Sequence, residues 1–396
     1  MTAFLDTVGV TCALGRGRDA VRDAMWKTDL AGIGEVTDRY STGRPLLLGT
    51  VPDLSDDASL ASALPDAYRS RNNMMLLDAL SQIRETVDAA IARVGPARVA
   101  VIIGTSTSGI HEGERAIQHL SRHGTLPASY HYGQQELGSP ALLLAKVLGT
   151  RGPAYAISTA CSSGAKAMAA GARLLRHGLA DIVLAGGVDT LCAFTVAGFS
   201  ALESVSAARC NPLSANRNGI NLGEGAALFL MSREAGPVRL AGWGESSDAH
   251  HVSAPDPQGE GARLAMRQAI ATAGIEPNAI DYVNLHGTAT PANDVMEAHA
   301  VADLLGTDVP VSSTKPLTGH TLAAAGAVEA ALMWLTIAGN PRGQLPPHWW
   351  DGAADGALPA LHVAEPGGTL GRAPRYVLSN SFAFGGSNCT LVMGAA

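Results

Sequence analysis

Short apolar runs alternate with longer Ala-rich runs along the chain. Val99–Gly104 (VAVIIG) has no polar side chain, which predicts a strand buried on both faces of a sheet. Asp181–Gly186 and Ala226–Met231 have the same apolar character. Pro140–Leu148 and Ala165–Leu175 are instead rich in Ala and Leu, which favour helices. This alternation predicts an α/β fold in which helices pack on sheets.

The same series of predicted elements occurs twice. Four pairs of segments match in the same order, namely 99–109 with 281–291, 157–175 with 311–335, 181–189 with 375–388, and 226–231 with 389–394. Repetition of several elements in one order predicts a duplicated architecture. We place the two halves at 1–235 and 236–396, joined within one packed unit at the polar segment 233–237.

The helices predicted after residues 161 and 320 consist largely of Ala and Gly. Ala169-Ala170-Gly171 in the first and AAAG (323–326) in the second carry no charge. A solvent-exposed helix face normally carries charged side chains, whereas small side chains allow helices to approach closely. We therefore expect both helices to form a middle layer between two sheets.

The composition of the 396-residue chain is that of a folded globular protein. Hydrophobic residues make up 46% of it and charged residues 16%, which excludes a disordered chain. The net charge is −7 and no Lys/Arg block occurs, so the sequence has no basic footprint for nucleic acid. Aromatic residues are only 5%, which also disfavours base-stacking platforms.

The five cysteines are odd in number and widely spaced, and no C-x-x-C motif occurs. This pattern disfavours a disulfide framework or a zinc knuckle and favours a reducing compartment. The N-terminus has no basic region before an apolar run, so we expect no signal peptide. The richest apolar stretch, EAALMWLTIAG, is too short to span a membrane. We therefore expect a cytoplasmic protein.

Cys161 occurs in STACSSG (158–164), between a predicted strand and a predicted helix. A thiol at the start of a helix lies at the positive end of the helix dipole, which lowers the thiol pKa and favours the nucleophilic thiolate. We therefore predict a reactive Cys161 with a lowered pKa; the alternative is a buried, inert thiol. Cys12, Cys192, Cys210 and Cys389 lack such a turn and are interpreted as inert.

Two histidines occupy turns that the duplication makes equivalent to functional turns of the first half. His286 begins HGTAT (286–290) directly after a predicted strand, and His320 precedes the second Ala-rich helix. A side chain at the carboxyl end of a strand in an α/β fold points into a crevice. We therefore expect both histidines to lie near Cys161 if the two halves pack face to face, although a single histidine is more often structural.

The motifs TACSSG, HGTATPANDVMEA, SSTKPLTGHTLAAAGAVEA and NSFAFGGSN occur in this order and spacing. Together they resemble the elongating β-ketoacyl-acyl-carrier-protein synthases, the type II ketosynthases of the thiolase superfamily. The segments 210–227 and 246–251 also resemble that family, so the resemblance covers nearly the whole chain. It implies a thiolase-like five-layer αβαβα fold with two pseudo-repeated halves, one carrying the nucleophile and the other both histidines.

The resemblance also implies catalytic roles. Cys161 would attack an acyl-carrier-protein thioester and hold the acyl chain. Loss of carbon dioxide from a malonyl-carrier protein would leave an enolate, whose oxygen His286 and His320 would stabilise. The backbone N–H groups of Cys161 and Phe384 would form a second oxyanion site for the tetrahedral adduct.

Further residues match positions of the family's motifs. Lys315 and Glu297 would act as a pair that orients the histidines and tunes their charge; the alternative is a buried salt bridge that merely joins two layers. Phe384 would be a gate beside flexible glycines, with Ala383 where many relatives carry Gly. The residues expected to line the pantetheine and acyl tunnel are Thr288, Thr290, Thr107, Phe199 and Phe382.

Two polar segments bear on the substrate. The loop 105–110 (TSTSGI) is rich in hydroxyl groups where long-chain fatty-acid enzymes tend to be apolar, and 130–136 (YHYGQQE) is polar and aromatic. A polar pocket disfavours an unmatched alkyl chain. We therefore expect an unsaturated or aryl-primed chain, as in polyene or aryl-polyene pathways; the alternative is ordinary fatty-acid elongation.

Two other functions share this fold. A non-catalytic chain-length factor would lose the nucleophilic cysteine, and a thiolase would use a second cysteine near the C-terminus, whereas Cys389 falls in a predicted strand. As partners we expect an acyl carrier protein and either a second copy of this chain or a homologous ketosynthase-like subunit. We expect no nucleic acid, membrane span, metal or cofactor apart from the carrier's phosphopantetheine.

Overall fold

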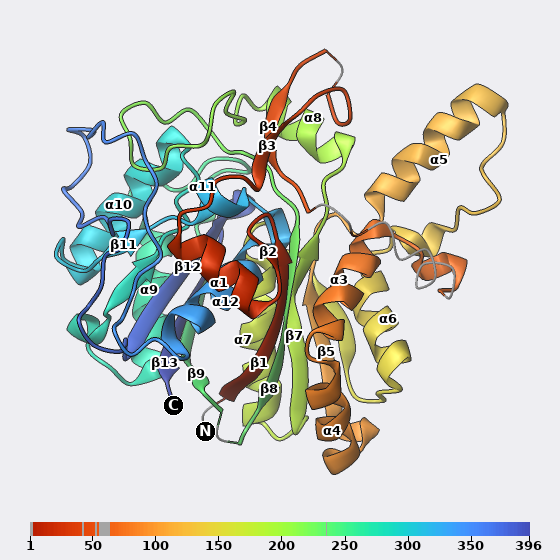
Figure 1. Cartoon of the computed structure of the whole chain (residues 1–396), viewed down its shortest axis with the longest axis horizontal. Helices are drawn as coiled ribbons and strands as arrows, with labels where there is room; N and C mark the ends of the chain where they lie inside the picture. Colours follow the sequence, from red (N-terminus) through yellow and green to blue (C-terminus); the bar gives the residue numbers. More distant parts are fainter. Residues whose placement is uncertain (1–2, 42, 52–53, 55–63, 235) are drawn as a thin grey trace.

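The computed structural model describes residues 3–41, 43–51, 54, 64–234 and 236–396 (Figure 1). Within them, hydrogen bonding joins eleven strands into one sheet, ordered β11-β10-β12-β13-β9-β1-β8-β7-β5-β6 with β2 beside β1. The strands of the first half are β1 (Ala3–Cys12), β2 (Gly15–Arg16), β5 (Val99–Gly104), β6 (Ala154–Ile157), β7 (Ile182–Asp189) and β8 (Gly225–Ser232). Those of the second are β9 (Val238–Ser247), β10 (Tyr282–Asn284), β11 (Val311–Ser312), β12 (Tyr376–Ala383) and β13 (Ser387–Ala395). A separate hairpin pairs β3 (Ile33–Val36) with β4 (Leu46–Gly49).

The strand order confirms the predicted duplication. Outward from β1 the order is β8-β7-β5-β6, and outward from β9 it is β13-β12-β10-β11, so equivalent strands occupy equivalent places. In both halves the three outer strands are parallel, while the strand next to β1 or β9 is antiparallel to both neighbours. The two half-sheets meet where Ala3–Leu5 pairs antiparallel with Val238–Leu240.

The predicted junction at 233–237 lies between β8 and β9. Residue 235 is outside the described residues, and the boundary between 235 and 236 stays a prediction.

The helices fall into three layers around the half-sheets. The first half-sheet is covered by α3 (Arg71–Ser81), α4 (Arg84–Val94) and α6 (Ser139–Leu148), and the second by α9 (Glu260–Ala273) and α10 (Pro291–Leu305). Between the half-sheets lie α7 (Ser163–Arg176) and α12 (Ala325–Ile337). The remaining helices are α1 (Arg18–Trp26), α5 (Ile110–His123), α8 (Ala193–Ala201) and α11 (Lys315–Thr318). Single 3₁₀ turns are η1 (Asp66–Tyr68), η2 (Pro96–Arg98), η3 (Tyr132–Gln134), η4 (Pro277–Ala279), η5 (Leu322–Ala324) and η6 (Phe384–Gly386).

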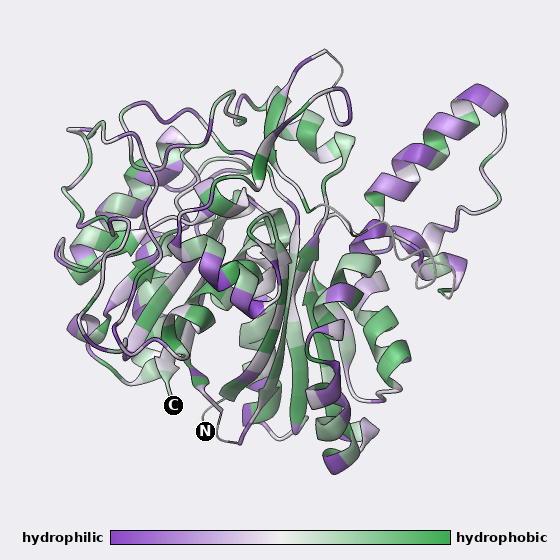
Figure 2. Cartoon of the chain, in the orientation of Figure 1, coloured by the Kyte–Doolittle hydropathy of each residue, from purple (hydrophilic) through white to green (hydrophobic). Residues whose placement is uncertain are grey.

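Three apolar cores separate these layers and confirm the five-layer αβαβα fold. One core packs α3, α4 and α6 against β5, β7 and β8, and another packs α9 and α10 against β10, β12 and β13. The central core encloses α7 and α12, and every residue of α12 is buried. Figure 2 shows the hydrophobic residues concentrated in the strands and inner helices, whereas the projecting helix α5 is largely hydrophilic.

Glycines set how closely the two middle helices approach. A Cβ on Gly164 of α7 would lie 2.8 Å from the backbone nitrogen of Ala327. A Cβ on Gly326 of α12 would lie 2.8 Å from both the Cβ and the nitrogen of Ala165. Real Cβ atoms do not tolerate such distances, so the absence of side chains here is required by the packing. The predicted middle layer is therefore confirmed, and its small residues are explained by the close contact between α7 and α12.

Among the described residues, no helix combines the length and the apolar character that crossing a membrane requires.

We predict that Gly326→Val lowers the free energy of unfolding by about 1–3 kcal/mol, because the new side chain overpacks the contact between α7 and α12. The control is Gly198→Ala in α8, where a Cβ has no neighbour within 4 Å. That change should be neutral or stabilising by up to about 1 kcal/mol, since Ala favours helix over Gly. Denaturant unfolding measures both; equal destabilisation of the two variants would contradict this account of the packing.

Candidate active site

Cys161 lies in a strained turn between β6 and α7. The preceding Ala160 has a left-handed φ of 50°, which a residue with a Cβ adopts at an energetic cost. Ser163 holds the turn, because its hydroxyl accepts from the backbone N–H of Thr159 at 2.8 Å and donates to the carbonyl of Ala160 at 2.6 Å. The turn leaves the Cys161 side chain at the start of α7, only 5% exposed.

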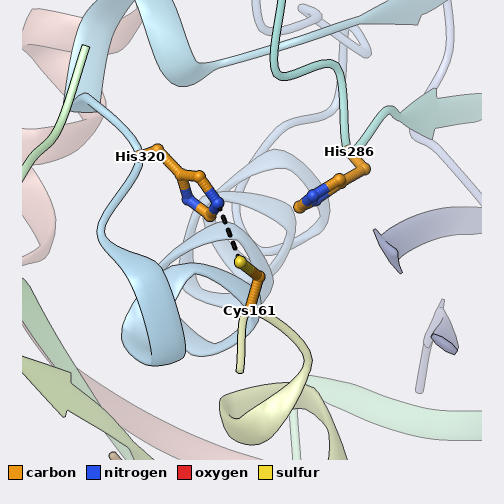
Figure 3. A group of neighbouring side chains, drawn as sticks. All are labelled: Cys161, His286 and His320. Atoms are coloured by element: carbon orange, nitrogen blue, oxygen red, sulfur yellow. Dashed lines mark hydrogen bonds between the residues drawn. The ribbon is translucent and has the colours of Figure 1, made fainter. Parts of the chain in front are cut away.

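His320 reaches Cys161 from the second half of the chain. Its Nε2 lies 3.0 Å from Cys161 Sγ (Figure 3). The backbone N–H of His320 donates to the carbonyl of Asn221 at 2.7 Å, which ties the histidine to the first half. Two residues later Leu322 has a left-handed φ of 51° and starts η5, the turn that leads into α12. Both sides of the Cys161–His320 contact therefore depend on a strained residue.

His286 follows β10 and completes the cluster. Its ring lies edge-on to the ring of His320, with 5.4 Å between centroids. The sulfur of Cys161 and one ring nitrogen of each histidine lie within 4.8 Å of one another. Figure 3 shows the three side chains converging from separate segments. The duplicated fold thus brings together the three residues that the sequence motifs singled out.

Burial determines the charge state of all three groups. It lowers the pKa of both histidines well below 6.5, and the positive charge of Lys315 lowers them further. Burial also raises the pKa of the Cys161 thiol to about 12, against smaller opposing effects of Lys315 and the backbone N–H of Phe384. The predicted lowering of this thiol pKa is therefore wrong, because the loss of water outweighs the favourable position at the helix start. At neutral pH the thiol is protonated and faces a neutral imidazole.

Lys315 and Glu297 both support His286, but they do not form the predicted pair. The ammonium of Lys315 donates to Glu329 of α12 and to the carbonyl of His286, and both ion-pair partners have side chains only 2% exposed. Glu297 instead accepts the backbone N–H groups of His286 and Gly287, each at 2.7 Å. Glu329 was missed in the sequence, although it is the single charged residue within Ala325–Ile337.

Phe384 begins η6 directly after β12, and its backbone N–H lies beside Cys161 Sγ, where it favours the thiolate. Gly385 and Gly386 have left-handed φ values of 80° and 70°, which only glycine adopts readily. The Phe384 ring packs against Phe199 of α8 with 5.7 Å between centroids. The backbone N–H of Phe384 therefore lies where the predicted oxyanion site requires a donor. The turn that holds it depends on the left-handed conformation of the two following glycines.

One cavity of about 380 Å³ reaches the three central residues. Four of the predicted tunnel residues line it, namely Thr288, Thr290, Phe199 and Phe382. The hydroxyls of Thr288 and Thr290 lie 2.9 Å apart. Asn388 and Asp248 also line the cavity and are joined by a hydrogen bond of 2.6 Å. No role was predicted for them, although both lie in segments that resemble the family.

Thr107 is the predicted tunnel residue that does not line this cavity. Its hydroxyl donates to Asp189 at 2.9 Å, and the hydroxyls of Thr105 and Ser106 donate to the same carboxylate. The hydroxyl of Ser108 donates to the carbonyl of Glu136 at 2.9 Å. The hydroxyls of the loop 105–110 are therefore hydrogen-bonded within the chain, and the substrate class that they were taken to indicate stays a prediction.

The other four cysteines are buried and do not line the cavity. Cys389 is enclosed in β13, where burial raises its thiol pKa strongly. A second cysteine acting beside Cys161, as in the thiolase alternative, is thus not present in this cavity.

Comparison with known proteins identifies the family. Residues 8–235 match the family model described as Beta-ketoacyl synthase, N-terminal domain, and residues 238–349 match Beta-ketoacyl synthase, C-terminal domain. The chain is 32% identical over 323 residues to 3-oxoacyl-[acyl-carrier-protein] synthase 2 of Staphylococcus aureus (strain COL), covering 74% of each protein. It is 34% identical over 319 residues to the synthase of the same name from Vibrio cholerae serotype O1, covering 75% of each.

A solved structure extends the similarity to the whole chain. A chain in the complex of the ketosynthase ApeO with its chain length factor ApeC from Xenorhabdus doucetiae is 42% identical, with a TM-score of 0.93. The match covers 100% of this chain and 98% of that one. Sequence motifs, duplicated fold and relatives agree, and the chain belongs to the β-ketoacyl synthase family.

Proposed function

We propose that this protein is an elongating β-ketoacyl-acyl-carrier-protein synthase that joins malonyl units to an acyl chain held on Cys161. The observation that carries the proposal is the contact of 3.0 Å between Cys161 Sγ and His320 Nε2, with His286 in the same cluster. A nucleophile beside a base and a second imidazole is the equipment that acyl transfer followed by condensation requires. The names of the curated relatives, 3-oxoacyl-[acyl-carrier-protein] synthase 2, support this substrate class.

In the first half-reaction the Cys161 thiol attacks the carbonyl carbon of an acyl-carrier thioester. Because the thiol is protonated at neutral pH, its proton passes to Nε2 of His320 as the carbon–sulfur bond forms. The oxyanion of the tetrahedral adduct accepts from the backbone N–H groups of Phe384 and Cys161. Collapse of the adduct breaks the carrier's carbon–sulfur bond, and the carrier thiolate leaves with the proton from His320.

In the second half-reaction a malonyl-carrier thioester loses carbon dioxide, and the electron pair of the broken bond forms an enolate. The imidazoles of His286 and His320 are neutral and can each donate one N–H to the enolate oxygen. One such donor is worth about 3–4 kcal/mol of barrier. The enolate carbon then attacks the acyl-Cys161 carbonyl, and the carbon–sulfur bond to Cys161 breaks. The departing thiolate takes up a proton from water through Nε2 of His320, which restores the thiol.

The surrounding residues keep this arrangement rigid. Lys315 joins Glu329 to the carbonyl of His286, and Glu297 binds two backbone N–H groups at the same turn. Thr288 and Thr290 line the cavity, which supports the proposal that their hydroxyls bind the carrier's pantetheine arm. The proposed chemistry uses no metal or cofactor besides that arm.

Two alternatives have less support. A non-catalytic chain-length factor needs no thiol at position 161, whereas here the thiol, both imidazoles and the N–H of Phe384 meet in one cavity. A thiolase needs a second cysteine at the reaction centre, and Cys161 is the single cysteine among the residues described around this cavity.

For partners we propose an acyl carrier protein and a ketosynthase-like subunit, either a second copy or a homologue. The chain of 42% identity belongs to a solved complex of the ketosynthase ApeO with its chain length factor ApeC, which favours the heterodimer. The resemblance to the family implies that the loop 105–110 reaches the acyl pocket of a partner subunit, so Thr107 remains a candidate residue of that pocket. Aryl-polyene elongation also stays a proposal. The hydroxyls of the loop 105–110 give it no support, because they are hydrogen-bonded within the chain.

We predict that Cys161→Ala abolishes condensation measured with purified acyl- and malonyl-carrier proteins, because no residue remains to hold the acyl chain. Cys389→Ala, which alters a buried thiol outside the cavity, is the matched control and should retain activity. Full condensation by Cys161→Ala would show that the nucleophile is assigned wrongly.

The raised pKa of Cys161 sets how its alkylation by iodoacetamide depends on pH. Only the thiolate reacts, and below a pKa of about 12 the thiolate fraction grows about tenfold per pH unit. The rate measured by peptide mass mapping should therefore rise from pH 7 to pH 10 without a plateau. A plateau below pH 8 would instead indicate a thiolate stabilised by the start of α7.

The identity of the acyl chain bound to Cys161 can be determined from the intact mass of the protein when it is expressed together with its neighbouring genes. We expect an adduct on Cys161 whose mass fits an unsaturated or aryl-primed chain. A series of saturated chains would contradict the aryl-polyene proposal and support ordinary fatty-acid elongation, while leaving the nucleophile unchanged.

A further inference from the structure

Asp189, at the end of β7, is a fully buried carboxylate that accepts six hydrogen bonds. Five of the donors belong to the loop after β5, namely the backbone N–H groups of Ser106 and Thr107 and the hydroxyls of Thr105, Ser106 and Thr107. The sixth is the backbone N–H of Ala323, at 2.8 Å. One side chain therefore joins the first half of the molecule to the segment that carries His320.

Both segments held by Asp189 contain a strained residue. Ser108, within the loop 105–110, has a φ of 40°, and Leu322, which precedes Ala323, has a φ of 51°. Residues with side chains occupy this left-handed region only when the surrounding structure compensates for the strain. A hydrogen bond from a buried N–H to a charged carboxylate is among the stronger ones available in a protein. The bond from Ala323 is thus placed to stabilise the turn between His320 and α12.

We propose that Asp189 is a positioning residue for catalysis, which fixes the His320 turn against the first half and so sets the distance from His320 to Cys161. This inference rests on the proposed function. Asp189 does not line the cavity, so it acts through the segment 320–323 rather than on substrate.

The distribution of donors shows why a carboxylate is needed. Oδ1 accepts two backbone N–H groups, from Ser106 and Thr107, whereas Oδ2 accepts the backbone N–H of Ala323 and the hydroxyl of Ser106. A hydroxyl can reverse and accept, but a backbone N–H cannot. In Asp189→Asn the amide oxygen should therefore take the Oδ1 position, where it keeps both backbone N–H groups, and the amide NH₂ should take the Oδ2 position. There two donors, the NH₂ group and the N–H of Ala323, face each other and no hydrogen bond forms. This nearly isosteric change removes the link to the His320 turn selectively.

The negative charge of Asp189 has a second, separable effect. Together with Glu329 it raises the pKa of the Cys161 thiol, whereas Lys315 lowers it, and the neutral rings of His286 and His320 face the sulfur. Removing the charge should therefore make Cys161 easier to deprotonate while condensation becomes slower. Exposure of the thiol by a loss of structure would also lower its pKa, because burial is the main cause of the raised value. Both measurements are therefore made on protein shown to be folded, beside a matched control variant.

The experiment compares Asp189→Asn with Asp281→Asn, in folded protein verified by circular dichroism. Asp281 is also a buried carboxylate that binds backbone N–H groups, those of Arg375 and Tyr376, but it lies at the opposite end of β10 from His286. We expect Asp189→Asn to lower kcat for condensation about 10- to 100-fold with KM changed less than about twofold, because small misplacements of reacting groups slow catalysis strongly. Its Cys161 alkylation profile should shift to lower pH, and Asp281→Asn should change neither measurement.

A second pair of variants measures the effect of Asp189 on the His320 turn in protein that has no thiol at position 161. Cys161→Gln should decarboxylate malonyl-carrier protein, a reaction that needs the histidines but no nucleophile. Adding Asp189→Asn to Cys161→Gln should lower that rate about tenfold or more, whereas adding Ser106→Ala, which leaves the Ala323 bond intact, should not.

Equal kcat and equal alkylation profiles for Asp189→Asn and the unmodified protein would overturn the inference. If Asp189→Asn does not fold, hydrogen exchange in the unmodified protein decides the matter, since an amide of Ala323 that exchanges within seconds would contradict the bond to Asp189. Absence of condensation by the unmodified protein would instead count against the proposed function.

Discussion

The close approach of α7 and α12 is the constraint on which the rest of the structure depends. Neither Gly164 of α7 nor Gly326 of α12 has room for a side chain. Helix α7 starts at the turn that carries Cys161, and α12 starts at the end of the turn that follows His320. Packing two equivalent helices against each other therefore brings two equivalent turns together. The contact of 3.0 Å between sulfur and imidazole is a consequence of this packing.

Burial then decides the chemistry of the cluster. With water excluded, the neutral forms of Cys161, His286 and His320 are favoured, and the buried ammonium of Lys315 is accommodated by Glu329. Neutral imidazoles suit both proposed steps, since the same ring nitrogen can accept a proton in one tautomer and donate a hydrogen bond in the other. Strain at Ala160 and Leu322 is compensated by hydrogen bonds from outside the cluster, among them the bond to Asp189.

The errors of the sequence analysis share one origin. The pKa of Cys161 and the partner of Lys315 both depend on neighbours that are distant in the chain. The hydrogen bonds of the hydroxyls at 105–107 depend on such neighbours as well. Lys315 of α11 and Glu329 of α12 belong to different helices, and their side chains meet only in the folded chain. A local motif contains no information on whether a polar group faces a cavity or a buried carboxylate.

The sequence by itself determined the duplicated α/β fold, the glycine-rich middle helices and the residues of the cluster, because periodicity, small-residue runs and turn motifs are local properties of the chain. The tertiary structure decided the charge states, the Lys315–Glu329 pair, the position of Thr107 outside the cavity and the six-bonded Asp189. These depend on burial and on contacts between the two halves, and both arise only when the halves pack together.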